Sequence, residues 1–228
     1  TLRRVSVLPS ETRRGIAKAM IGGAVSLAVD AGLKRVEVLC RREFPELADW
    51  WGKHGFGLLR ENASGIVLGR DLPVAVTVPT PDAMHALGVE LAGLLRAGDV
   101  IIATGELGAG KTTLARGIGE GLGVEGPVIS PTFVLSRIHP SRGGGPDLVH
   151  VDAYRMAGAD ELADIDLDAT LPGSVTLVEW GEGIAEWLSD ERLEIDIDRE
   201  IGDEARRVTL TGTGPRWAGA LEALRRNP

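Results

Sequence analysis

Cysteine is nearly absent from this sequence, which contains a single one, Cys40. One thiol cannot form an internal disulfide or supply the ligands of a zinc site. Long hydrophobic runs are also missing, since no stretch approaches the roughly 20 apolar residues that a membrane span requires. We therefore expect a reduced, cytoplasmic protein with no membrane partner, and the sequence leaves open whether further residues precede Thr1.

An excess of basic residues is lacking as well. The chain has 25 Lys and Arg residues against 33 Asp and Glu residues, which gives a net charge of −8. Binding to a nucleic-acid backbone relies on a basic surface, so this balance argues against direct binding of nucleic acid. The hydrophobic fraction of 43% and the charged fraction of 25% are those of a globular protein with a packed core.

Two patterns of predicted elements follow one another along the chain. The first predicts strands at residues 3–8, 35–39 and 56–60 and helices at residues 16–31 and 45–54. Asp71-Leu-Pro73 and Pro79-Thr-Pro81 then interrupt the periodicity. We place a boundary near residue 72, which gives a small α/β segment over residues 1–71 and a larger domain over residues 72–228.

The second pattern is that of an α/β protein with a mixed sheet. It predicts strands at residues 74–78, 100–103, 133–138, 148–152, 175–179, 193–197 and 208–210. Helices are expected to begin at residue 81 and to span residues 112–122 and 217–224.

A glycine-rich loop joins the strand at residues 100–103 to the helix at residues 112–122. It consists of Gly105, Glu106, Leu107, Gly108, Ala109, Gly110, Lys111, Thr112 and Thr113. Glycine at 105 and 110 lets successive backbone N–H groups point at phosphate oxygens without a Cβ in the way. Lys111 is suited to the β- and γ-phosphates and the Thr112 hydroxyl to Mg²⁺. The loop therefore predicts a P-loop NTPase fold that binds ATP with Mg²⁺ and hydrolyses it, rather than an ordinary strand-to-helix turn.

Four further segments follow this loop in a specific order. They are Ser130-Pro-Thr-Phe133, His150-Val-Asp-Ala-Tyr-Arg155, Glu161-Leu-Ala-Asp-Ile165 and Val178-Glu-Trp-Gly-Glu182. With the P-loop they make residues 80–200 resemble the TsaE family, the ATPase subunit of the bacterial tRNA threonylcarbamoyladenosine machinery. The resemblance implies an ATPase that works with two partners, a threonylcarbamoyl transferase subunit and its paralogous scaffold subunit. It also implies that hydrolysis resets the transferase complex between rounds of modifying adenosine 37 of tRNA, and that tRNA is reached only through the complex.

The resemblance also assigns roles to individual residues. It makes Thr132 a switch-like threonine near the γ-phosphate and Asp152 the acid that orients the water or the metal shell. It makes Glu179 the acid on the metal side, followed by Trp180. Thr112, Glu179 and Asp152 are thus the candidate metal ligands, and which of the two acids binds Mg²⁺ directly stays open.

Plainer interpretations exist for the same residues. Thr132 and Asp152 can cap turns, and Trp180 can be a large core residue at a strand end. His150 lies on an apolar strand, and we interpret it as a core or strand-end histidine rather than a catalytic base.

The segments Pro9–Ala17 and Ala48–Phe56 resemble the C-terminal half of a GCN5-related N-acetyltransferase (GNAT) domain. In that family a Q/R-x-x-G-x-G/A loop binds the pyrophosphate of acetyl-CoA through backbone N–H groups. Here Thr12 stands where the family has Gln or Arg, and Trp51 where many members have a tyrosine acid. We expect no acetyl transfer. A structural or vestigial role is favoured over the alternative, binding of CoA.

Two other functions are compatible with a P-loop. A P-loop kinase usually has an arginine-rich lid, but only Arg137, Arg142 and Arg155 occur between Val124 and Ile165. This favours an ATPase over a small-molecule kinase. The sequence does not separate an ATPase from an ATP-dependent assembly module without essential hydrolysis.

Overall fold

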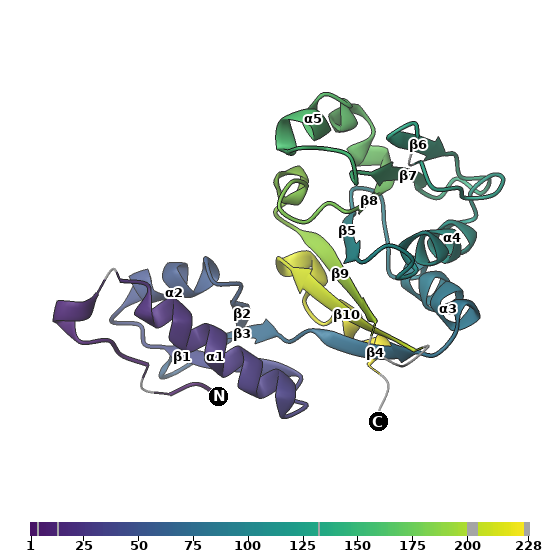
Figure 1. The fold of residues 1–228 in the computed structure, drawn as a ribbon. Helices are drawn as coiled ribbons and strands as arrows, with labels where there is room; N and C mark the ends of the chain where they lie inside the picture. Colours follow the sequence, from purple (N-terminus) through teal and green to yellow (C-terminus); the bar gives the residue numbers. More distant parts are fainter. Residues whose placement is uncertain (4, 13, 132, 200–204, 226–228) are drawn as a thin grey trace. The chain divides into compact units, whose positions relative to one another are not determined.

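The computed structural model describes residues 1–3, 5–12, 14–131, 133–199 and 205–225 of the 228-residue chain. The chain divides into two compact units, Thr1–Pro73 and Val74–Pro228, which we call unit 1 and unit 2 (Figure 1). Within the described residues no helix has the length and apolar character needed to cross a membrane.

Unit 1 is a small sheet covered by two helices. Its antiparallel strands lie in the order β1-β3-β2. The elements are the 3-10 helix η1 (Pro9–Glu11), α1 (Ile16–Asp30), β1 (Arg35–Cys40), α2 (Pro45–Gly52), β2 (Gly57–Asn62) and β3 (Gly65–Asp71). The inward side chains of β1 pack with Ile21 of α1 and Trp51 of α2 in a core of their own.

The predicted strand at residues 3–8 is wrong. Leu2 forms one isolated parallel bridge with Val38, and no described residue from 3 to 8 is in a strand. Alternating apolar residues form a strand only when their backbone groups find a partner strand, and among the described residues of this segment the bond toward β1 runs from Leu2 N to Glu37 O, 2.7 Å. The prediction also missed β3, whose short apolar run between Gly65 and Gly69 looks like a turn from sequence.

Unit 2 contains a seven-stranded sheet in the order β4-β10-β9-β5-β8-β7-β6. The strands are β4 (Val74–Val78), β5 (Val100–Gly105), β6 (Ser136–His139), β7 (Asp147–Asp152), β8 (Ser174–Glu179), β9 (Arg192–Arg199) and β10 (Arg206–Thr213). The four central strands, β9, β5, β8 and β7, are parallel to one another. The outer pairs β4–β10, β10–β9 and β6–β7 are antiparallel. The predicted mixed α/β sheet is therefore confirmed.

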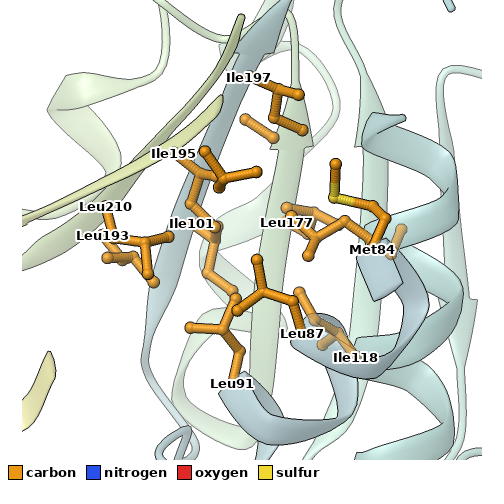
Figure 2. Close-up of a cluster of buried hydrophobic side chains, with 14 of the residues drawn as sticks. Met84, Leu87, Leu91, Ile101, Ile118, Leu177, Leu193, Ile195, Ile197 and Leu210 are labelled. Atoms are coloured by element: carbon orange, nitrogen blue, oxygen red, sulfur yellow. The ribbon is translucent and has the colours of Figure 1, made fainter. Parts of the chain in front are cut away.

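Two helices cover one face of this sheet, α3 (Pro81–Ala92) and α4 (Lys111–Leu122) (Figure 1). The Thr80 hydroxyl accepts a hydrogen bond from Ala83 N, 3.1 Å, and Pro81 occupies the first helical turn, which is why α3 begins there. Figure 2 shows the buried cluster between helices and sheet. Its members include Met84, Leu87, Leu91, Ile101, Ile118, Leu177, Leu193, Ile195, Ile197 and Leu210. Each such side chain contributes about 1.5–3 kcal/mol on burial.

The helices α3 and α4 touch backbone to backbone. A Cβ at Gly88 would lie 2.4 Å from Leu114 O, and one at Gly117 would lie 2.1 Å from His85 O. No side chain fits at either position. Because α4 starts at Lys111, this close contact helps to fix the end of the helix at which the P-loop lies.

Short elements cover the other face. They are α5 (Ala159–Ala163) and the 3-10 helices η2 (Leu167–Ala169), η3 (Leu171–Gly173) and η4 (Glu186–Leu188). Leu162 and Leu167 pack there against Val100, Ile102 and Val178. The strands β5 and β8 are therefore buried on both faces, which explains why apolar residues predominate in both of them.

The end of the chain differs from the prediction. The helix expected at residues 217–224 is wrong, since two 3-10 helices occur there, η5 (Pro215–Trp217) and η6 (Ala220–Leu224), separated by Gly219 at φ +72°. The Arg216 guanidinium holds this segment by donating two hydrogen bonds, 2.9 and 2.6 Å, to the buried carboxylate of Asp99. Such bidentate pairing anchors the segment without a regular helix.

The strand expected at residues 133–138 is shorter than predicted and begins at Ser136. The N–H groups of Val134 and Leu135 both donate to Pro131 O, at 2.8 Å, which makes a turn there, and Leu135 has φ +65°.

Candidate nucleotide-binding site

The glycine-rich loop links the end of β5 to the start of α4. Gly105 has φ +146°, and a Cβ on it would lie 2.6 Å from Ile197 O. Gly110 has φ +119°, and a Cβ there would lie 3.2 Å from Met84 Cε. Both positions therefore require glycine for backbone conformation, and Gly105 requires it for space as well. The loop continues into the N-terminus of α4. The free backbone N–H groups at a helix N-terminus make this a favourable place for an anion.

Lys111 is the first residue of α4 and is only 5% exposed. Its ammonium donates to the carbonyl oxygens of Gly105, 2.6 Å, and Glu106, 3.0 Å, and so lies across its own loop. The Nζ atom is also 3.7 Å from the centre of the Trp180 ring. Burial lowers the pKa of Lys111, while the nearby carboxylates of Glu179 and Asp152 oppose that shift. A buried cation held by carbonyls and an indole face is suited to binding phosphate.

Thr112 lies next to an acid from a neighbouring strand. Its hydroxyl donates to the Glu179 carboxylate, with Oγ1 3.0 Å from Oε1 and 3.3 Å from Oε2. Glu179 ends β8, which pairs in parallel with β5 so that Ala103 and Glu179 are in register. Parallel strands bring their carboxyl ends to the same edge of the sheet, and this places the acid, only 3% exposed, beside the loop.

Asp152 ends the next strand, β7, in register with Glu179. One carboxylate oxygen accepts from the backbone N–H of Tyr154, 3.1 Å, and the other from the Ser130 hydroxyl, 3.3 Å. The turn-capping role considered from sequence is thus present in the bond to Tyr154 N. The bond to Ser130 also ties the acid to the segment that precedes residue 132.

Trp180 has a conformation that is unusual for its residue type. Its φ is +63°, in the left-handed region, and its N–H donates to Ala103 O, 2.9 Å. The ring packs against Tyr154, with 5.1 Å between ring centres, and covers the ammonium of Lys111. Such a backbone conformation costs about 1–3 kcal/mol and tends to occur at functional sites. This conformation places the indole over the lysine, and the bond to Ala103 and the packing on Tyr154 keep it there.

The fold brings together five of the predicted site residues, which are Lys111, Thr112, Asp152, Glu179 and Trp180. Thr132 lies outside the described residues. At the rim, the side chains of Leu107 and Phe133 are 86% and 85% exposed. Glu106 is exposed beside Leu107, whereas Ala109 is buried and Thr113 is half-buried on α4.

Two further residues take part that the sequence analysis did not assign to the site, Ser130 and His150. His150 is fully buried, as expected, but its Nε2 atom is 2.8 Å from Glu179 Oε1. A signal for this existed, because residues two apart in a strand share a face, so His150 and Asp152 point the same way.

The residues present fit a magnesium ion together with nucleotide phosphates. Among the described residues no group of three or more His, Cys, Asp or Glu side chains could hold a metal alone. Mg²⁺ commonly takes only one or two protein carboxylates and completes its shell with phosphate oxygens and water. A threonine hydroxyl hydrogen-bonded to a glutamate at the end of the loop supplies that limited set.

Residues 78–208 match the family described as "Threonylcarbamoyl adenosine biosynthesis protein TsaE". The chain belongs to the TsaE family. A Streptomyces coelicolor protein named tRNA threonylcarbamoyladenosine biosynthesis protein TsaE is 62% identical over 141 residues, which cover 60% of this chain and 95% of that protein. A Bacillus subtilis protein of the same name is 42% identical over 148 residues, covering 64% of this chain and 90% of that protein.

A solved structure is also similar to this chain. The crystal structure of YdiB from Bacillus subtilis has a TM-score of 0.55 and 36% sequence identity, and the match covers 67% of this chain and 93% of that one. The matched TsaE region begins at Val78 and contains the loop and both acids. It lies within unit 2, so unit 1 is outside the family match.

Proposed function

We propose that this TsaE chain binds ATP with Mg²⁺ and hydrolyses it as the ATPase subunit of a complex that makes N6-threonylcarbamoyladenosine in tRNA. The observation that carries the proposal is the bond between the Thr112 hydroxyl and Glu179, at the end of a loop that also holds the buried ammonium of Lys111. The names of the family and its relatives supply the tRNA pathway.

Within this site the residues divide the work. Lys111 exchanges the carbonyls of Gly105 and Glu106 for β- and γ-phosphate oxygens, which bind a cation more strongly. Mg²⁺, when bound, neutralises charge on the phosphates that develops as the γ-phosphoryl group leaves. Thr112 and Glu179 are placed to hold the metal side of the site. Asp152, tied to Ser130 and Tyr154, is placed to orient the attacking water.

The partners we propose are the threonylcarbamoyl transferase subunit and its paralogous scaffold subunit, with tRNA reached through them. The net charge of −8 supports an indirect role toward tRNA. Hydrolysis resets the transferase complex between turnovers. Docking of the partners beside the site accelerates it by ordering Thr132 and Trp180 around the γ-phosphate.

The test is steady-state ATP hydrolysis by the chain alone and with the two partner proteins, with and without tRNA. Slow hydrolysis that the partners stimulate is expected, together with tRNA modification over many turnovers that needs this chain. If modification cycles equally well with wild type, with Lys111→Ala and with no added chain, the reset function is wrong. Phosphate transferred to a small metabolite would indicate a kinase instead.

Unit 1 we propose to be a separate domain with a structural role and no acetyl transfer. The GNAT-like assignment rests on the loop at Pro9–Ala17 and is supported by the helix that follows Gly15. Trp51, which stands in place of the family's tyrosine acid, is buried against Phe56. Its indole N–H does not ionise near neutral pH and so cannot act as a general acid. Calorimetry with CoA against residues 1–71, and with ATP and Mg²⁺ against residues 72–228, tests the division. Acetyl transfer by the first part, or a folded second part that binds no ATP, contradicts it.

A further inference from the structure

A buried histidine lies directly behind the acid of the nucleotide site. His150 is in the middle of β7, with a side chain that is 0% exposed, and its Nε2 atom is 2.8 Å from Oε1 of Glu179. The same oxygen accepts from the Thr112 hydroxyl at 3.0 Å. One carboxylate oxygen therefore joins His150 to the threonine of the P-loop.

The surroundings of His150 do not explain its polarity. Its neighbours on the same face of the sheet include Leu148 and Leu177, which belong to the apolar core beneath α3 and α4. A leucine of similar volume would fill this place without the cost of burying a polar ring, about 1–3 kcal/mol when unpaired. Among the described residues the ring has its hydrogen bond with Glu179, so the contact with this acid accounts for the histidine.

The hydrogen-bond network assigns the tautomer of the ring. Nδ1 is buried and has no hydrogen-bond partner among the described residues. A proton on Nδ1 would leave an unsatisfied buried donor, whereas a proton on Nε2 is donated to Glu179. The ring thus acts as a donor toward the carboxylate, as imidazoles and carboxylates do in the outer shell of many metal sites.

We propose that His150 is a positioning residue for ATP hydrolysis, which holds the Glu179 carboxylate in the orientation in which it meets Thr112. The inference rests on the proposed function, because Glu179 and Thr112 are the residues assigned there to the metal side of the site. A carboxylate fixed from behind by a strand residue has less rotational freedom than one that ends a strand unsupported. His150 acts through Glu179 and does not touch the substrate.

The first experiment compares three variants of the full chain in the partner-stimulated ATPase assay. His150→Leu removes the donor and keeps the volume, and His150→Gln keeps an N–H donor near the position of Nε2. His139→Leu is the matched control, because it removes another buried imidazole, on the neighbouring strand β6. The Nε2 atom of His139 has no hydrogen-bond partner among the described residues.

His150→Leu is expected to lower kcat about 10- to 100-fold, the range typical for outer-shell residues of metal sites, with little change in KM for ATP. His150→Gln should recover most of the rate, and His139→Leu should keep it. Wild-type kcat in His150→Leu overturns the proposal, and so does a folded His150→Gln that is as slow as the leucine variant. An equal loss in His139→Leu also overturns it, since the effect would then be one of packing.

A double-mutant cycle tests whether the histidine works through the acid. In a Glu179→Ala background His150→Leu should cause no further loss of kcat, because the group it positions is gone. Losses that multiply in the double variant contradict the proposal. The cycle is measured on chains whose thermal unfolding is recorded alongside, so a fold defect is seen separately from a rate defect.

The activity of the wild-type chain distinguishes a failure of the proposed function from a failure of this inference. If wild-type chain with its partners hydrolyses no ATP, the proposed function is wrong, and the inference is decided by nucleotide binding as a function of Mg²⁺ concentration. His150→Leu should then shift the Mg²⁺ midpoint upward by about 10-fold or more. An unchanged midpoint overturns the inference.

Discussion

Among the loops that place a glycine at the N-terminus of a helix, those that precede α1 and α4 differ in almost everything else. Gly15 precedes α1 with φ +76°, and Gly110 precedes α4 with φ +119°. A Cβ on Gly15 would meet nothing within 4 Å, whereas one on Gly110 would meet Met84. The first loop stands open at the surface of unit 1, whereas the second ends in the buried residues Ala109 and Lys111 of unit 2.

The polar groups of the two loops differ in the same way. Beside Gly15, the Thr12 hydroxyl donates to Pro9 O, 3.0 Å, and Arg14 forms an ion pair with Glu11, all on exposed side chains. Beside Gly110, by contrast, a buried lysine lies among two buried acids and an indole. A glycine and a helix N-terminus supply backbone N–H groups in both places. The loop at Gly110 adds to these N–H groups a buried cation and buried acids, which the sheet behind it holds in place.

The largest expected effect comes from removing the cation of the packed loop. Lys111→Ala should abolish productive ATP binding, since truncating a buried charged partner costs about 2–5 kcal/mol. Arg14→Ala, which removes the basic residue beside the other loop's glycine, should leave ATP binding unchanged. Calorimetry with ATP and Mg²⁺ measures both. Wild-type affinity in Lys111→Ala would show that the packed loop is no more a phosphate site than the open one.

The acids give the next largest effect. Asp152→Ala and Glu179→Ala should each lower turnover about 10²- to 10³-fold while ATP still binds, because their work is done on the metal and the water as the γ-phosphate leaves. Glu11→Ala, which removes the exposed acid of the open loop, is the control and should turn over normally. The assay is ATP hydrolysis within the assembled complex. If either variant hydrolyses ATP at the normal rate, the acid that it lacks has a structural role.

Trp180 sharpens the comparison, because the open loop has no counterpart of an indole over a cation. Trp180→Ala should keep basal hydrolysis and lose the stimulation by the partner proteins, an effect within the range of about 5- to 150-fold typical of coupling between sites. The matched control is Trp187→Ala on η4, a half-exposed tryptophan beyond the strand end. Rates with and without partners separate the two quantities. Stimulation that survives in Trp180→Ala removes this residue from the partner response.

The smallest effects concern helix packing in the two units. Gly117→Ala should destabilise unit 2 by about 1–3 kcal/mol, because the added methyl group meets the backbone of α3. Gly23→Ala in α1, where a Cβ meets nothing within 4 Å, should instead stabilise unit 1 by about 0.4–1 kcal/mol. Amide hydrogen exchange in the full chain measures each unit in the same sample. If Gly117→Ala left the stability of unit 2 unchanged or raised it, the close contact between α3 and α4 would not be rigid, and if Gly23→Ala destabilised unit 1, the surroundings of α1 would not be open.

The sequence carried enough information for most elements of unit 2 but for less of unit 1. The strands β5 and β8 are predicted because burial on both faces leaves them rich in apolar, β-branched residues. The error at residues 3–8 arose because a strand depends on partners that are distant in sequence. The strand β3 was missed because its short apolar run lies between Gly65 and Gly69. The error at residues 217–224 arose because helical spacing does not distinguish an α-helix from two 3-10 turns.

The identity of the site residues could be predicted from motifs, whereas their contacts could not. Nothing in the sequence says that the Thr112 hydroxyl meets Glu179, 67 residues away, or that Trp180 has φ +63°. His150 was interpreted as a core residue because its strand is apolar, and that burial is correct. Only the position of β7 beside β8 shows that its ring reaches Glu179.

By itself, the sequence determined the mixed α/β fold, the glycine-rich loop between strand and helix and the family of this protein, because spacing and residue type along a short segment are local properties. The tertiary structure decided which acid meets the P-loop threonine, what covers the lysine and why a histidine is buried. Those outcomes depend on strand order and register, which bring residues from β5, β7 and β8 to one edge of the sheet. Pairing between strands is set by the packing of the whole domain, so no local stretch of sequence contains it.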